Sequence, residues 1–337
     1  MSAVYIFEPH LDQAIIIAKL FRIYSNKKVF GVVTDDDYPS YNKKYYHGFV
    51  QESDVPRNAG NMCIPTGAIS TEYFLERGDI PLGDVYLSKN CIIANDKTLL
   101  LKKAVDAGIP IPKTWANSGD IPDNEYPVFY KQNKEAVKDI HIRGIANKKD
   151  ELPPNANSEV IFQEFIEAKG IFQVCYIASD GEILDYSVHY VSESIPKVGG
   201  SALFISKIEN TKMLEYTRSL IKELNYSGWG QAEYIYCSNR DDYVFLEINA
   251  KFWASCDFAF RNNPEFTKLL FNLETKNENI KKLVYFDRAM ARGRSFFIKN
   301  ILIIMTSKKN FDFMSGKKIM WFMFPKLSSR IFRNFSE

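Results

Sequence analysis

The sequence lacks the short motifs that mark several common classes of enzyme. It contains no Gly-x-x-x-x-Gly-Lys-[Ser/Thr] segment, which excludes a P-loop by pattern, and no Gly-x-Gly-x-x-Gly after its first predicted strand. A dinucleotide-binding domain is therefore not supported. The four histidines show no His-Glu-x-x-His pattern and no paired spacing, which argues against a zinc enzyme. A Ser-His or Cys-His nucleophile signature is also missing.

Cysteine is scarce as well. The five cysteines are odd in number and widely spaced, with no Cys-x-x-Cys pair, which predicts reduced thiols in a cytosol and no disulfide framework. The chain starts with an apolar strand pattern at residues 3–7 and no basic region before it, so we expect no signal peptide and a cytoplasmic location. With 337 residues, 46% hydrophobic and 25% charged, it can bury a core and form two or three domains or subdomains.

Residues 1 to about 94 have the pattern of a small α/β unit. We predict a strand at Val4–Phe7, a helix at Leu11–Ser25 and a buried strand at Lys28–Thr34, which together imply a parallel sheet with a right-handed crossover. Asp35-Asp36-Asp37 follow the second strand, at the edge where open α/β sheets bind ligands. A solvated turn is the favoured interpretation of this triplet, and a substrate contact is the alternative. Ile64–Ala68 is predicted to be a further strand end with a glycine turn.

The most informative segment is a predicted β-hairpin near residue 240. Residues 231–236 and 245–253 alternate aromatic and β-branched side chains with others, and the polar run 237–242 separates them. Glu247 and Asn249 then face the same side, with Glu233 on the neighbouring strand. Three oxygen ligands of this kind suit Mg²⁺ with phosphate oxygens. The alternative, an edge hairpin with solvated carboxylates, is about equally supported by spacing alone.

This hairpin also carries a family resemblance. The run Glu-Ile-Asn-Ala-Lys-Phe-Trp at residues 247–253, preceded by Gly-Gln-Ala-Glu at residues 230–233, resembles the metal-binding end of ATP-grasp enzymes, especially the carbamoyl-phosphate-synthase-like, carboxylate–amine ligase branch. The resemblance implies that Glu233, Glu247 and Asn249 hold the metal ions that bridge the ATP phosphates. Lys251 stands where the family usually has arginine and loses the bidentate fork, so its implied catalytic role is less secure.

Further segments resemble the same family in the same order, over roughly residues 95 to 265. Residues 95–97 and 107–114 resemble the entry segment with its Gly-Ile-Pro-x-Pro turn, and residues 126–131 resemble the strand with the second nucleotide lysine. The resemblance implies that Lys97 and Lys131 contact ATP phosphates, whereas either lysine alone would be read as a surface charge. Residues 160–166 resemble the hinge strand, so the resemblance places adenine beside Glu164, Phe165 and Ile166.

One departure from the family concerns the loop after the second lysine. Family members usually have a glycine-rich loop there that closes over phosphates, but residues 132–143 contain no glycine. Lys134, Lys138, His141 and Arg143 occupy this segment, and Arg143 is the best candidate to replace backbone donors. A disordered or weakly active lid is the alternative.

A second loop is a candidate for contact with the substrate. Gly199-Gly200-Ser201 resembles loops near the reacting substrate in this branch, and its glycines allow close backbone approach. His189 and Lys197 flank it and are candidates for contact with an acyl phosphate or acceptor. An ordinary flexible turn is equally supported.

The last fifty residues differ in charge from the rest of the chain. Residues 288–337 have a net charge of +9 and the remainder −7, and basic residues alternate with apolar runs at 296–305 and 319–324. Neither run reaches the roughly 20 residues of a membrane span. Three interpretations remain: a segment on an anionic membrane surface, on its inner face; a helix docked on the core; or a partner-binding face. Nucleic acid is less favoured because no known module is present.

The expected fold is therefore α/β, an ATP-grasp fold with an α+β lid and an N-terminal Rossmann-like pre-ATP-grasp domain. The predicted parts are residues 1–94, an ATP-grasp domain at 95–275 (lid about 95–165, metal-binding subdomain about 166–275) and a basic aromatic segment at 276–337. The resemblance implies a ligase that uses ATP and Mg²⁺, with Mn²⁺ as an alternative, to activate a small-molecule or glycan-precursor carboxylate and join it to an amine. The rivals are a kinase-like phosphoryl transferase and a membrane-attached nucleotide-binding module without turnover. Oligomeric state is not predicted.

Overall fold

Four parallel strands and one long helix form the N-terminal part of the chain, and the strand at Gly48–Gln51 was not predicted. The computed structural model describes residues 2–33, 43–56, 60–134, 142–153, 159–196 and 200–313, so Asp35-Asp36-Asp37 lie outside the described residues. The sheet has the strand order β3-β2-β1-β4. Its elements are β1 (Ala3–Phe7), α1 (Asp12–Tyr24), β2 (Lys28–Val33), β3 (Gly48–Gln51), β4 (Met62–Ile64) and α2 (Ala68–Leu75). The predicted strands, helix and Gly67 turn are all present, because near-continuous apolar runs of this kind suit strands that are buried in a parallel sheet.

A second, antiparallel sheet lies in the part of the chain that was predicted to be the lid, and we call this sheet the lid. Its strand order is β7-β10-β8-β9, and its own small core includes Val128, Ala146 and Phe162. The elements are α3 (Lys97–Asp106), β7 (Thr114–Trp115), β8 (Val128–Gln132), β9 (Arg143–Ala146) and β10 (Val160–Glu164). Asp96 caps α3, because its side chain accepts a hydrogen bond from the backbone N–H of Leu99 at 3.1 Å.

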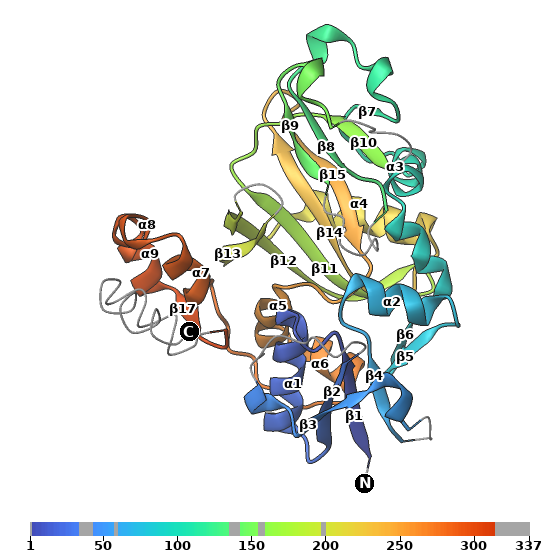
Figure 1. Cartoon of the computed structure of the whole chain (residues 1–337), viewed down its shortest axis with the longest axis vertical. Helices are drawn as coiled ribbons and strands as arrows, with labels where there is room; N and C mark the ends of the chain where they lie inside the picture. Colours follow the sequence, from blue (N-terminus) through green and yellow to red (C-terminus); the bar gives the residue numbers. More distant parts are fainter. Residues whose placement is uncertain are drawn as a thin grey trace, which may run out of the picture.

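The largest sheet has seven strands in the order β15-β14-β11-β12-β13-β16-β17. All neighbouring pairs are antiparallel except β16 and β17, which are parallel. The elements of this part are β11 (Ile171–Ser179), β12 (Glu182–Ile195), β13 (Ser201–Lys207), α4 (Thr211–Glu223), β14 (Gly228–Cys237), β15 (Asp242–Asn249), β16 (Lys282–Tyr285) and β17 (Lys308–Asn310). In Figure 1 this sheet lies between the lid at the top and the N-terminal sheet at the bottom.

Short elements join these sheets to one another. The two-stranded ribbon of β5 (Ile80–Leu82) and β6 (Val85–Leu87) contacts β14, and α5 (Cys256–Asn262) and α6 (Pro264–Phe271) follow the site hairpin. Phe21 of α1 packs edge-on against Phe271 at 5.5 Å between ring centres. Residues 256–271 therefore pack against α1 of the N-terminal part (Figure 1). The boundaries at about residues 94, 165 and 275 stay a prediction.

The C-terminal residues form a separate lobe at the side of the large sheet. Figure 1 shows α7 (Phe286–Ala291), α8 (Arg294–Lys299), α9 (Ile301–Thr306) and β17 at the left, away from the lid. β16 and β17 belong to the large sheet, so this part of the basic segment is joined to the core. Among the described residues no helix is long and apolar enough to cross a membrane. No disulfide bond joins the five cysteines, all of which lie among the described residues.

Candidate functional site

The hairpin of β14 and β15 brings the three predicted metal ligands together. Glu233 lies directly opposite Glu247, and Gln231 lies opposite Asn249, in the antiparallel register. Directly opposite residues share one face of a sheet, so both carboxylates and the amide are on the same side. Asn249 Nδ2 lies 3.4 Å from Glu233 Oε1 and 3.3 Å from Gln231 Oε1. The predicted hairpin, its polar loop and the shared face are confirmed.

Two buried lysines from the lid half of the chain reach this hairpin. Lys131 Nζ donates to Glu247 Oε2 at 3.0 Å and lies 3.4 Å from the carbonyl oxygen of Leu246. Lys97 Nζ is 4.0 Å from the same carboxylate oxygen. The lysine side chains are only 6% and 11% exposed. Buried ammonium groups require charged partners, and here they share one carboxylate at the junction of two sheets.

Asn133 fixes the position of Lys97 relative to the lid. The backbone N–H of Lys97 donates to the Asn133 carbonyl at 3.1 Å, and the Asn133 side chain contacts both Thr98 and Asp96. The start of α3 and the end of β8 are therefore tied together. The two lysines, 34 positions apart in the sequence, approach the same carboxylate because of this connection.

The ionised form of the Glu233 carboxyl group is destabilised by its surroundings. Burial, and next the charge of Glu247, raise its pKa to about 7. A hydrogen bond from Gln173 Nε2 to Glu233 Oε1, at 2.9 Å, and the charges of Lys131 and Lys251 act in the opposite direction. A buried carboxyl whose pKa is raised by burial and a like charge is characteristic of a functional site.

Gln173 and His189 form a chain of hydrogen bonds that ends at the Glu233 carboxylate. Neither residue was identified from the sequence as a partner of Glu233. Gln173 lies opposite Glu233 in the β11–β14 register. Its amide nitrogen donates to Glu233, so its oxygen accepts, and Nε2 of His189 lies 2.7 Å from that oxygen. His189 Nε2 therefore carries the hydrogen. A single amide inside the otherwise apolar run of β11 was the available sequence signal.

His189 does not lie where a direct substrate contact would require it. Its side chain is fully buried, and burial lowers its pKa to about 3, so the ring is neutral. Cys175 Sγ lies 3.8 Å from Nδ1, and the Phe258 ring packs edge-on against the imidazole. This geometry favours a positioning role for His189, through Gln173, over the direct contact that the sequence suggested.

Lys251 lies just beyond β15, and Arg143 is the first residue of β9. Lys251 Nζ donates to Asn249 Oδ1 at 3.2 Å, so Lys251 orients the Asn249 amide. Arg143 lies directly across from Lys131 in the β8–β9 register. The two side chains leave the same face of the lid sheet, and Arg143 is exposed there. Lys138 and His141 lie outside the described residues.

The predicted hinge lies where β10 leaves the lid. Glu164 forms an ion pair with Arg240 of the β14–β15 loop, and its side chain also accepts from the backbone N–H of Lys113 at 3.0 Å. Phe165 is 37% exposed, and Ile166 packs against the buried cluster of Ile235, Cys237 and Val244. The lid and the β14–β15 hairpin are therefore connected at two places, through Lys131 and through Glu164.

The predicted substrate loop is only partly described. Lys197 and Gly199 lie outside the described residues, whereas Gly200 directly precedes β13, in which Ser201 is the first residue. A Cβ atom on Gly200 would lie 2.0 Å from the carbonyl oxygen of Pro196. Close backbone approach therefore requires glycine at this position, as the sequence suggested, while a substrate contact stays a prediction.

The donor set fits Mg²⁺ when phosphate oxygens complete it. Among the described residues no group of three or more His, Cys, Asp and Glu side chains converges on one point. Glu233 and Glu247 supply two carboxylates and Asn249 one amide oxygen, which is the hard, oxygen-only set that Mg²⁺ prefers with waters and phosphates. The two carboxylates face each other across the hairpin, and the charge of Glu247 is the second cause, after burial, of the raised pKa of Glu233. A divalent cation would relieve that repulsion.

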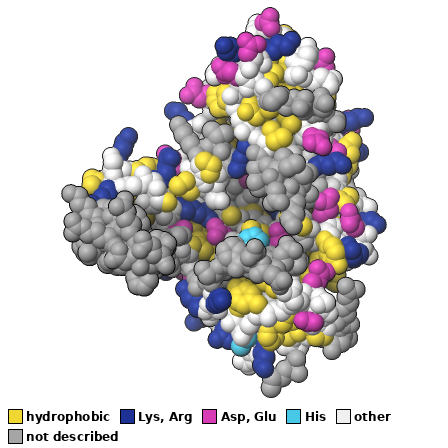
Figure 2. Space-filling model, viewed as in Figure 1, with side chains coloured by type: hydrophobic (Ala, Val, Ile, Leu, Met, Phe, Trp, Pro, Cys, Tyr) yellow, Lys and Arg dark blue, Asp and Glu magenta, His cyan; other side chains and the backbone are white. Residues whose placement is uncertain are grey.

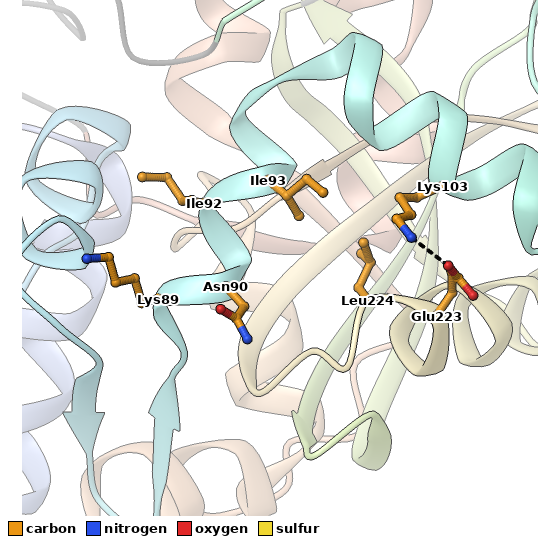
Figure 3. Close-up of a pocket in the computed structure, with 7 residues that line it drawn as sticks. All are labelled: Lys89, Asn90, Ile92, Ile93, Lys103, Glu223 and Leu224. Atoms are coloured by element: carbon orange, nitrogen blue, oxygen red, sulfur yellow. Dashed lines mark hydrogen bonds and ion pairs between the residues drawn. The ribbon is translucent and has the colours of Figure 1, made fainter.

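A surface pocket of about 470 Å³ lies away from this cluster (Figure 3). Its lining includes Ile92, Ile93 and Leu224, with Lys103 and Glu223 paired at 2.8 Å. None of the predicted site residues lines it. The facing charges of Lys103 and Glu223 neutralise each other, but Lys89 also lines the pocket, so the lining has one positive charge in excess.

Comparison with known proteins identifies the fold. No protein-family model matches the sequence, and no curated protein is similar to it by sequence comparison. Among solved structures, biotin carboxylase from Campylobacter jejuni has a TM-score of 0.59 at 15% identity, over 83% of this chain and 74% of that chain. N5-carboxyaminoimidazole synthase from Aspergillus clavatus, in complex with ADP and 5-aminoimidazole ribonucleotide, has a TM-score of 0.59 at 13% identity, over 82% and 79%.

A third similar structure is pyruvate carboxylase from Rhizobium etli, with a TM-score of 0.57 at 11% identity. The match covers 78% of this chain but spans only 27% of that one. Identities this low establish the fold alone. The chain thus has the α/β architecture of ATP-grasp carboxylases and ligases, and the predicted fold class is confirmed.

Proposed function

We propose that this protein is an ATP-dependent ligase of the carboxylate–amine type, which activates a carboxylate as an acyl phosphate and transfers the acyl group to an amine. One observation carries the proposal. Two buried lysines from the lid half converge on Glu247, beside a second carboxylate and an amide on the same hairpin. A purely structural hairpin has no need for two buried cations and two facing carboxylates, since the desolvation of each charge is costly.

The chain's own residues suggest a division of roles. Lys97 and Lys131 would exchange Glu247 for the phosphate oxygens of ATP, and Arg143 would approach from the same face of the lid as Lys131. Glu233, Glu247 and Asn249 would hold Mg²⁺, with Mn²⁺ as an alternative, and the bound ion would supply positive charge that offsets the charge of the phosphates. Positioning and electrostatics then dominate the chemistry, so no protein nucleophile is needed.

The substrates are proposed by class. A carboxylate oxygen attacks the γ-phosphorus of ATP, the bond to ADP breaks, and an acyl phosphate forms. An amine then attacks the acyl carbon, phosphate leaves and the amine loses a proton. One of the similar structures, from Hydrogenobacter thermophilus, was solved with MgADP and bicarbonate, so bicarbonate is the first carboxylate to test. Amino acids, peptides and sugar acids, including carboxylate-bearing glycan precursors, follow. We place the reaction in the cytoplasm, where ATP is available.

A screen for ADP release tests this proposal. The protein is incubated with Mg²⁺ and ATP, each carboxylate in turn, and an amine mixture. A positive reaction is repeated with hydroxylamine, which traps an acyl phosphate as a hydroxamate. A hydroxamate that depends on both the carboxylate and Glu247 supports a ligase. ADP release with a stable phosphorylated product and no hydroxamate would instead identify the kinase-like rival.

The remaining rival is a nucleotide-binding module without turnover. ATP binding with no ADP release for any carboxylate would favour it over the ligase. The glycine-free lid segment and Lys251 are the features that motivate this rival. The intact set of Glu233, Glu247 and Asn249 on one face argues against it.

A further inference from the structure

An exposed apolar surface covers the outer side of α8 and α9. Of fifteen large hydrophobic side chains that are exposed among the described residues, six lie between Ile298 and Phe311. Ile298, Leu302 and Met305 are 70%, 76% and 67% exposed. We call Ile298, Ile301, Leu302, Ile303 and Met305 the α8–α9 surface. Such concentration is unusual, because exposed hydrophobic residues in a soluble protein are normally scattered singly.

The opposite side of the same helices is firmly packed. Ile304 is buried in a cluster with Phe204 of β13 and Val284 of β16, and Phe296 and Phe297 pack against that cluster. The Phe296 and Phe204 rings stack at 6.1 Å between centres. The helices are therefore seated on the large sheet, and the α8–α9 surface is the side that the sheet leaves uncovered.

Positive charge surrounds this surface. Residues 288–313 contain six Lys and Arg and a single acidic residue, Asp312. Asp312 is buried and paired with Lys19 at 2.7 Å, so it does not offset the charge outside. Arg288, Arg292 and Lys308 pair with carboxylates outside this segment: Asp12, Glu193 and Glu278. Arg294 and Lys299 are exposed beside the apolar side chains and supply the positive charge there. Where the described part of this lobe is visible in Figure 2, hydrophobic and basic side chains lie next to one another.

We propose that the α8–α9 surface docks on an anionic lipid bilayer, with its apolar side chains inserted at the level of the headgroups. An anionic bilayer offers an apolar region in which the exposed hydrophobic side chains are removed from water. Its headgroups also carry the negative charge that attracts the basic rim. A second copy of this chain would meet the surface with the same positive charge. Residues 314–337 carry five basic residues and one acidic residue. Their positive charge would be repelled by the basic rim of the α8–α9 surface and attracted by an anionic bilayer.

This docking is independent of the proposed reaction. The α8–α9 surface contains none of the nucleotide or metal residues, and Figure 1 shows its lobe away from the lid. Loss of membrane binding therefore leaves ADP release measurable, and failure of the ligase proposal leaves vesicle binding measurable. The two proposals stand or fall on separate experiments.

Co-sedimentation of the full chain with vesicles tests the docking. One set of vesicles is pure phosphatidylcholine, and the other contains equal parts of phosphatidylserine. We expect binding to the anionic set, and loss of most of it between ~0.05 M and ~0.5 M NaCl, because screening weakens surface attraction. Equal binding to both sets, or no binding to either at low salt, overturns the proposal.

A matched pair of variants locates the contact. Leu302→Asp, in the full chain, should lower the vesicle affinity by about ten-fold or more, because it removes one inserted leucine and adds a repelled charge. Leu184→Asp is the control, since Leu184 is also exposed, at 52%, but lies on β12; it should bind as the unmodified protein does. Normal binding by Leu302→Asp would assign the affinity to residues outside the surface and overturn the proposal. Dimerisation of the unmodified protein that Leu302→Asp abolishes, without vesicle binding, would assign the surface to self-association instead.

Discussion

Glu233 and Glu247 face each other across a hairpin, and this arrangement is unfavourable unless a cation is nearby. Like charges directly opposite on neighbouring strands destabilise a sheet. Lys131 offsets Glu247 at 3.0 Å, whereas among the described residues Glu233 contacts the amides of Gln173 and Asn249. A divalent ion would remove the remaining repulsion between Glu233 and Glu247. The pair of carboxylates that destabilises the hairpin without metal is therefore the pair that we propose to bind the metal.

The role of Glu247 is tested by a nearly isosteric change. Glu247→Gln should retain the fold and lower ADP release by at least about ten-fold, which corresponds to about 1.4 kcal/mol of activation free energy. The physical reason is the loss of one of the two anionic metal ligands. ADP release is measured across a Mg²⁺ titration, with circular dichroism as a check on folding. Turnover and Mg²⁺ dependence like those of the unmodified protein would disprove the metal assignment.

Glu233 predicts a pH dependence of stability in the absence of metal. Its pKa in the folded protein, about 7, lies above its ordinary value of 4.5. The folded state therefore binds this proton more tightly, so the contribution to stability is full below pH 4.5 and is lost as the pH rises through 7. With chelator present, the Tm of the unmodified protein should fall relative to the Tm of Glu233→Gln as the pH is raised from 5 to 8. A pH-independent difference would contradict this, and added Mg²⁺ should protect the unmodified protein most at the higher pH.

At the scale of elements, the lid and the large sheet are joined by contacts that depend on charge. Lys131 on β8 binds Glu247 on β15, and Arg240 in the β14–β15 loop binds Glu164 at the end of β10. These ion pairs connect the lid to the hairpin at two places. A nucleotide between them would compete for the first pair and leave the second in place.

Lys131→Ala should therefore weaken ATP far more than AMP. The lysine is proposed to contact the distal phosphates, which AMP lacks, and its loss should raise the Kd for ATP by about ten-fold or more. Both affinities are measured by calorimetry on the same protein. Lys113→Ala is a suitable control, because Lys113 also pairs with a glutamate, Glu125, at 2.7 Å but is 56% exposed. Equal losses for ATP and AMP would indicate misfolding or a different nucleotide position.

The elements that the sequence predicted best are those whose pattern is local. The β14–β15 hairpin and the strand–helix–strand start of the chain have short-range periodicity that fixes them. The partners of Glu233 could not be predicted in the same way. Gln173 is 60 residues away from it and meets it only through the β11–β14 register. His189 was noticed for its place beside a glycine loop, but its burial depends on α5, which supplies Phe258.

At the scale of the whole molecule, Arg288 connects parts that are distant in the sequence. Its guanidinium donates to Asp12 at the start of α1 and to the carbonyl oxygen of Ala202 in β13, and it lies 4.1 Å from the centre of the Tyr285 ring. The side chain is 7% exposed. The N-terminal sheet, the large sheet and the C-terminal lobe thus share one buried cation.

Arg288→Ala should destabilise the whole chain. The change removes the counter-charge of Asp12, which is 33% exposed, and one donor to the Ala202 carbonyl, so we expect a loss of about 1–3 kcal/mol in the free energy of unfolding. Arg294→Ala, at an exposed position of the same lobe, should change the free energy of unfolding by less than about 0.5 kcal/mol. Urea denaturation of both variants measures the difference. A loss at Arg288 as small as that at Arg294 would show that the three parts do not depend on this contact.

The parallel pairing of β16 with β17 also bears on how the protein avoids aggregation. β17 is the last strand of the large sheet in the part of the chain that is described, and it carries Lys308 and Lys309. Charged lysines on an outermost strand discourage a sheet from recruiting strands of other molecules. Without β17, the apolar β16, Lys-Leu-Val-Tyr, would become the open boundary. A chain shortened before residue 308 would therefore be expected to self-associate by backbone pairing at β16. The C-terminal lobe thus protects the large sheet against pairing with other molecules.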